Sequence, residues 1–98
     1  MIPLRFLPDA EAELLHETAY YSAARRGFGV KFKDAVRAAT DRAVRTPQAG
    51  APGLGDTRKF RVKGFPFNVY YRANAEEVLV VAIAPDSKSP GYWLGRIV

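Results

Sequence analysis

Basic and aromatic side chains are concentrated in the second half of the chain, and they are the best candidates for a binding or catalytic site. The cations are Arg58, Lys59, Arg61, Lys63, Arg72, Lys88 and Arg96, and the rings among them are Tyr70, Tyr71, Tyr92 and Trp93. Such a set can bind RNA, because cations neutralise phosphates and rings stack on bases. Arginine and lysine can also stabilise phosphate charge in a transition state. The competing interpretation places Tyr71 and Trp93 in the core and the cations in water.

The sequence contains none of the common motifs for metal binding, nucleophilic catalysis or nucleotide binding. His16 is the only histidine, so no second histidine stands at metal-ligand spacing. There is no cysteine, no Ser/His/Asp set, no P-loop and no dinucleotide fingerprint. We therefore expect neither a metal nor a cofactor. Glu11, Glu13 and Glu17 are expected to be solvated carboxylates on a helix face.

The overall charge indicates an acidic partner. The 98 residues carry a formal net charge of +5 with a pI of about 9.8, which favours nucleic acid or an acidic protein segment. The lack of cysteine suits a reducing compartment. The start of the chain lacks the features of a signal peptide. The longest apolar run, Val78 to Pro85, is too short to cross a bilayer. We expect a cytoplasmic protein that binds no membrane.

Two helices are predicted in the first half. Residues 2–7 read as an edge strand broken by Pro3, and residues 8–25 as a helix with Pro8 in its first turn. Gly29 is expected to break the chain before a second helix. That helix buries Phe32, Val36, Ala39 and Ala43, which share one helical face, and it ends at Thr46-Pro47. The two helices should form an antiparallel hairpin.

The second half predicts strands. Residues 48–56 read as a loop, and residues 58–63 and 67–72 alternate as strands do. In the first of these strands Arg58 should face away from Arg61 and Lys63. Residues 78–84 are apolar throughout, as in a central strand covered on both faces.

The predicted architecture is a single α+β domain over residues 1–98. It comprises an N-terminal edge strand, an antiparallel helix hairpin and a three-stranded antiparallel meander. The helices should cover one face of the sheet, and the other face should be open and carry some of the strand cations. Trp93, after a Pro-Gly turn, should anchor the C-terminal tail against the sheet.

Three C-terminal stretches carry a family resemblance. They are Phe-Pro-Phe-Asn-Val-Tyr-Tyr-Arg at residues 65–72, the apolar run at 78–84 and Pro-Gly-Tyr-Trp-Leu-Gly-Arg at 90–96. The first half agrees at Pro8, Ala10, Glu13-Leu14, Tyr20-Tyr21, Phe32 and Thr46-Pro47. Over nearly its whole length the chain resembles the ParE/RelE toxin superfamily, and within it most closely the ParE, or plasmid-stabilisation, branch.

The resemblance implies a type II toxin–antitoxin role, with no cofactor. Such a toxin binds an antitoxin, ParD-like or similar, whose C-terminal segment wraps over it. ParE toxins poison DNA gyrase, whereas RelE relatives cleave mRNA on the ribosome with basic residues and often a C-terminal tyrosine. If the chain is a nuclease, the resemblance assigns the scissile phosphate to Arg58, Arg61, Lys88 and Tyr92.

The sequence departs from the family pattern after the last strand. Pro85 stands where the family commonly has histidine, and Lys88 where it has arginine. Lysine keeps the charge but lacks the bidentate fork of arginine. This departure favours a gyrase-binding toxin over an enzyme. The alternatives are a RelE-like ribosome-dependent mRNA endoribonuclease and an inactive relative that only binds its antitoxin. The candidates for partner binding are Lys59, Arg61, Lys63, Tyr70, Arg72, Trp93 and Arg96.

Overall fold

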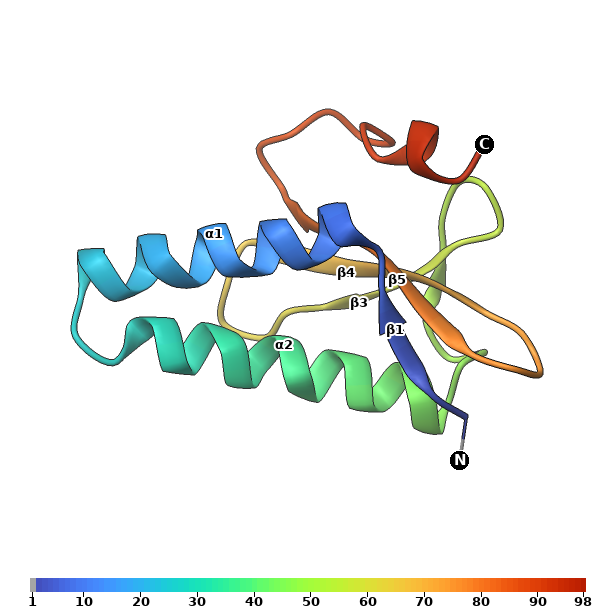
Figure 1. The fold of residues 1–98 in the computed structure, drawn as a ribbon, viewed down its shortest axis with the longest axis horizontal. Coiled ribbons are helices and arrows are strands. Elements are labelled where there is room, and N and C mark those ends of the chain that lie inside the picture. The colour runs from blue at the N-terminus through green and yellow to red at the C-terminus, as the bar shows by residue number, and fades with distance from the viewer. Residues whose placement is uncertain (1) are drawn as a thin grey trace.

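The two predicted helices form a hairpin along one face of the sheet (Figure 1). A computed structural model describes residues 2–98. Helix α1 spans Pro8–Ala24 and begins with proline in its first turn, where a missing N–H costs no hydrogen bond. Helix α2 spans Phe28–Arg45, and its buried residues include all four predicted apolar positions. The 3.6-residue period of those apolar residues is the cause of this match.

Gly29 does not break the chain as the sequence analysis expected. It lies inside α2, and the turn between the helices is centred on Gly27, whose φ is 84°. A Cβ atom at position 29 would lie 1.8 Å from Ser22 Oγ and 2.8 Å from the Thr18 carbonyl oxygen of α1. The glycine therefore lets the two helices approach closely, because no side chain stands between them.

The sheet has five strands in the order β1-β5-β4-β3-β2. Strand β1 spans Leu4–Phe6 and runs parallel to β5, Val78–Pro85. Strands β3, Arg58–Arg61, and β4, Phe67–Ala73, complete the predicted antiparallel meander with β5. The segment predicted as a plain loop contains a fifth strand, β2, Ala51–Pro52, which pairs with β3. The fold is α+β, as predicted.

A bulge distributes the side chains of β5 between two cores. Tyr70 pairs with Ala82 and Tyr71 with Val80, so Val81 has no partner residue on β4. Consequently Val81 and Ala82 both face away from the helices, while Val80 packs beneath them. The expectation that β5 is covered on both faces is confirmed.

The face opposite the helices is not open, contrary to the sequence analysis. Residues 86–98, here called the C-terminal segment, cross it and end in a 3₁₀ turn, η1, at Leu94–Arg96 (Figure 1). Trp93, a residue of this segment, has 1% of its surface exposed and packs with Val81, Ala82 and Ala84 of β5. The expectation that Trp93 anchors the tail is confirmed.

Candidate functional site

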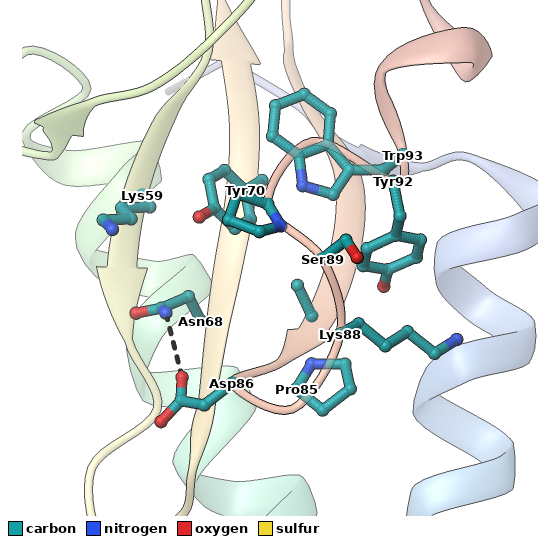
Figure 2. Close-up of a pocket in the computed structure, with 11 residues that line it drawn as sticks. Lys59, Asn68, Tyr70, Pro85, Asp86, Lys88, Ser89, Tyr92 and Trp93 are labelled. Carbon is teal, nitrogen blue, oxygen red and sulfur yellow. Dashed lines mark hydrogen bonds between the residues drawn. The ribbon is translucent and has the colours of Figure 1, made fainter.

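A hollow of about 190 Å³ lies between the sheet and the C-terminal segment, on the side away from the helices (Figure 2). We call it the C-terminal hollow. Strands β3, β4 and β5 form its floor, and the C-terminal segment forms one wall. Its polar and aromatic lining consists of Lys59, Asn68, Tyr70, Asp86, Lys88, Ser89, Tyr92 and Trp93.

Two lysines stand at this hollow without a carboxylate partner. Lys59 Nζ lies 5.8 Å from the centre of the Tyr70 ring, and Lys88 Nζ lies 4.7 Å from the centre of the Tyr92 ring. Neither lysine forms an ion pair with any group in residues 2–98. Each ammonium group lies over the face of a tyrosine ring, and Lys59 is also close enough to Asp86 to lower the pKa of that carboxyl.

Arg61 and Asp86 form an exposed two-pronged ion pair beside the hollow. Arg61 donates from Nη1 and Nη2 to the two Asp86 oxygens at 2.7 and 2.8 Å. The hydrogen bond from Arg61 lowers the pKa of Asp86, and nearby Lys59 lowers it further. Arg61 therefore offsets the one carboxylate that lines the hollow.

Glu13 holds the C-terminal segment against α1 and β5, which the sequence analysis did not foresee. Its Oε1 accepts from the Ile83 amide at 3.1 Å and from Arg96 Nη1 at 2.9 Å. Its Oε2 accepts from the Tyr92 hydroxyl at 2.5 Å and from Arg96 Nη2 at 2.9 Å. We call Glu13, Tyr92 and Arg96 the Glu13 clamp.

The clamp provides hydrogen-bond partners for backbone groups of β5 beyond the end of β1. Strand β1 stops at Phe6, so the edge of β5 beyond Val80 has no neighbouring strand on that side. Glu13 accepts from the Ile83 amide there, and Arg96 donates to the Val81 carbonyl oxygen at 3.0 Å. Buried backbone groups need such partners, so the two side chains take the place of a missing strand.

Burial and hydrogen bonding act in opposite directions on Glu13. Burial raises its pKa, but the hydrogen bonds from Arg96, Tyr92 and the Ile83 amide outweigh burial, so the pKa lies below its ordinary value. Burial and the hydrogen bond to Glu13 raise the pKa of Tyr92 far above the ordinary tyrosine value. The expectation that Glu13 is solvated is wrong. Its position three residues after Ala10, the one fully buried residue of α1, is the sequence signal that could have revealed it.

The four nuclease candidates do not meet at one point. Arg58 donates to the Gly50 carbonyl oxygen at 2.9 Å, on the opposite side of β3 from Arg61. Arg61 is paired with Asp86, and the Tyr92 hydroxyl is held by Glu13. Only Lys88 stands at the hollow without such a partner among residues 2–98.

The partner-binding candidates also separate. Lys59 and Tyr70 line the C-terminal hollow, and Arg61 is paired with Asp86 beside it. Lys63 is exposed in the turn after β3, and Arg72 lines a different hollow with Asp56 and Leu79. Two further candidates have contacts within the chain: the Trp93 side chain is almost wholly buried, and Arg96 is hydrogen-bonded in the Glu13 clamp.

Comparison with known families identifies the chain. The sequence model described as the ParE toxin of the type II toxin–antitoxin system parDE matches residues 4–90. The chain belongs to the ParE toxin family. Membership implies a toxin of a type II toxin–antitoxin system and an antitoxin partner. No curated protein matches the chain.

Solved structures support the fold of this ParE-family chain. It is similar to a chain of the chromosomal ParDE toxin–antitoxin system from P. aeruginosa, with a TM-score of 0.71 and 18% identity. The match covers 87% of this chain and 96% of that one. Within residues 2–98, neither helix is both long and apolar enough to span a membrane, and no three carboxylate or histidine side chains gather as metal ligands would.

Proposed function

We propose that this ParE-family chain arrests growth in the cytoplasm by binding DNA gyrase, and that a ParD-like antitoxin neutralises it. The observation that carries the proposal is the dispersal of the nuclease candidates. RNA cleavage needs a base for the 2′-hydroxyl and an acid for the leaving oxygen, or converging cations in their place. Arg58 lies on the helix side of the sheet, while Lys88 lies on the other. They cannot act on one phosphate.

The state of Tyr92 also favours a binding toxin over a nuclease. Its hydroxyl donates to Glu13, and its pKa is raised by burial and by that carboxylate. A phenol whose proton is held in this way is a poor donor to a leaving group and a poor base. Binding to a protein requires only a complementary surface, which exposed cations such as Arg61 and Lys63 can supply.

Antitoxin binding is supported by charge as well as by family. The chain has a net charge of +5, and neither Lys59 nor Lys88 forms an ion pair with a carboxylate in residues 2–98. An acidic partner segment would be attracted to this surface and would associate faster at low ionic strength.

A ribosome-dependent endoribonuclease is the second candidate. It is favoured by the gathering of Lys59, Lys88 and Tyr92 around one hollow (Figure 2). In that case the Tyr92 hydroxyl would have to leave Glu13 before the chemical step.

Expression in the host with a reporter plasmid tests the toxin proposal. We expect growth arrest, loss of negative supercoiling in the plasmid, and relief of both by the co-expressed antitoxin. Normal growth at high soluble expression would contradict a toxic activity. Arrest with unchanged plasmid topology would contradict gyrase as the target.

A further inference from the structure

We propose that the turn between α1 and α2 binds the phosphate backbone of double-stranded DNA without reading its sequence. Arg25, Arg26 and Lys31 would each contact a phosphate group, and Phe28 holds two of these cations in place. We call these four residues the helix-turn patch. The proposal rests on the charge and geometry of this turn, so it does not depend on gyrase as the target.

The helix-turn patch lies at the end of the molecule opposite both chain termini (Figure 1). Two backbone hydrogen bonds fix the turn, from the Arg25 amide to the Tyr21 carbonyl oxygen and from the Phe28 amide to the Arg25 carbonyl oxygen, both at 3.1 Å. Arg25, Arg26 and Lys31 are all exposed. A partner can therefore reach the three cations without any change in the fold.

Phe28 brings two of the cations together. Arg25 Cζ lies 4.7 Å from the centre of the Phe28 ring, and Lys31 Nζ lies 5.5 Å from it. The two charges are therefore no farther apart than these two distances together. Phe65, in the turn between β3 and β4, packs edge-to-face on the same ring with centres 6.5 Å apart. Like charges this close repel each other, and an incoming anion would relieve that repulsion.

No carboxylate of the protein offsets this charge by an ion pair. Arg25, Arg26 and Lys31 form no ion pair with any group in residues 2–98. No aspartate or glutamate occurs in residues 18–33 or 57–75, the two stretches that Phe28 and Phe65 bring together. Asp86 lies beside the β3–β4 turn, but Arg61 binds both of its oxygens. The positive charge of the helix-turn patch is thus available to a partner.

The shape of the patch favours duplex DNA over an acidic peptide. Peptide segments commonly bind in grooves or along sheet edges, whereas this patch surrounds a turn at one end of the molecule (Figure 1). Duplex DNA carries one charge per about 1.7 Å of its axis, so cations spread around a turn can each meet a phosphate. The wide major groove of B-DNA admits a protein element, but that of duplex RNA is deep and narrow. A single strand would need ring faces for base stacking, and Phe28 already contacts two cations.

Salt dependence of DNA binding tests the proposal. The full chain is titrated into a short fluorescent DNA duplex, and the association constant is measured by anisotropy at several salt concentrations. The logarithm of this constant falls with the logarithm of salt concentration, with a slope of about −0.9 for each phosphate contacted. We expect binding in the range of non-specific DNA affinity, a dissociation constant of about 10⁻⁶–10⁻⁴ M, and equal binding of two duplexes with unrelated sequences.

Charge-removing variants locate the binding surface. Arg25→Gln, Arg26→Gln and Lys31→Gln should each reduce the steepness of the salt dependence by about 1 and weaken binding equally for both duplexes. Arg45→Gln is the matched control, because it removes the same charge from an exposed residue of α2. Arg45 lies about 20 Å from Lys31 along the helix, so this variant should keep the wild-type salt dependence.

Four results would overturn the proposal. The first three are no binding of the duplex, a wild-type salt dependence in the variant that lacks all three cations, and an equal loss in Arg45→Gln. The fourth is equal or tighter binding of an RNA duplex or of a glutamate-only peptide of matched charge, which would assign the patch to RNA or to an acidic protein. The reaction contains no gyrase, so each of these results leaves the proposed target to be judged separately.

Discussion

Glu13 and Arg96 are 83 positions apart in the chain, yet their side chains form a two-pronged hydrogen bond with both N···O distances at 2.9 Å. The pair is largely shielded, with 16% of the Glu13 side chain and 18% of the Arg96 side chain exposed. Through it the last turn of the chain is fixed to the first helix. The wall of the C-terminal hollow is therefore held by a contact outside the hollow itself.

Removing the carboxylate of this clamp should destabilise the fold. Glu13→Ala leaves the Arg96 guanidinium, the Tyr92 hydroxyl and the Ile83 amide without their acceptor. We expect a loss of about 2–4 kcal/mol in the free energy of unfolding, typical of breaking a shielded ion pair from one side. Denaturant unfolding measures it. Glu11→Ala, an exposed carboxylate on the same helix, should change stability by no more than about 0.5 kcal/mol. Equal losses in the two variants would contradict the clamp.

The clamp also predicts that the folded protein loses stability as the pH falls. The pKa of Glu13 is lowered in the folded protein, so the unfolded chain binds its proton at a higher pH than the folded chain does. The stabilisation is therefore complete above the ordinary value of 4.5 and is lost as the pH falls through the lower folded-state pKa. We expect the melting temperature of the wild type to fall more steeply between about pH 5 and pH 3 than that of Glu13→Gln. Parallel pH curves for the two proteins would exclude this contribution.

Trp93 should be a major contributor to stability. The residue is 1% exposed, and its ring packs on that of Tyr70. Trp93→Ala should lower the free energy of unfolding by about 3–5 kcal/mol, the usual cost of deleting a large buried aromatic side chain. Leu15→Ala, which removes a side chain of a residue that is 64% exposed, serves as the control. A melting temperature for Trp93→Ala equal to that of the wild type would place the ring outside the core.

The close approach of the helices depends on Gly29. In Gly29→Ala the new methyl group meets Ser22 Oγ and the Thr18 carbonyl oxygen at distances that require the helices to move. We expect a net loss of about 1–3 kcal/mol from overpacking, despite the better helix propensity of alanine. Gly95→Ala is the control, because a Cβ atom at that position meets nothing within 4 Å. Thermal melts that rank Gly95→Ala as the less stable variant would refute this explanation.

Features set by local periodicity could be predicted from the sequence. The buried face of α2 follows from apolar residues at helical spacing, such as Phe32 and Val36, and the burial of β5 follows from an unbroken apolar run. These patterns lie within a few residues of one another. For the same reason the alternation on β3 correctly placed Arg58 opposite Arg61.

The details of the site depend on contacts between distant parts of the chain. No local pattern pairs Glu13 with Arg96, because their meeting requires the C-terminal segment to fold back over β5. The bulge at Val81 is equally hidden, since a strand that is apolar throughout does not reveal which residue is extra. For this reason sequence reasoning predicted that Glu13 is solvated and that Arg96 is available to bind a partner.

Paired assays with purified protein test the central claim most directly. The chain, its Arg61→Ala variant and its Lys88→Ala variant are each added to a gyrase supercoiling reaction and to mRNA on translating ribosomes. The account predicts that the wild type inhibits supercoiling or traps cleaved DNA, and that mRNA stays intact in all three reactions. Site-specific mRNA cuts that disappear in either variant would contradict it and establish the nuclease.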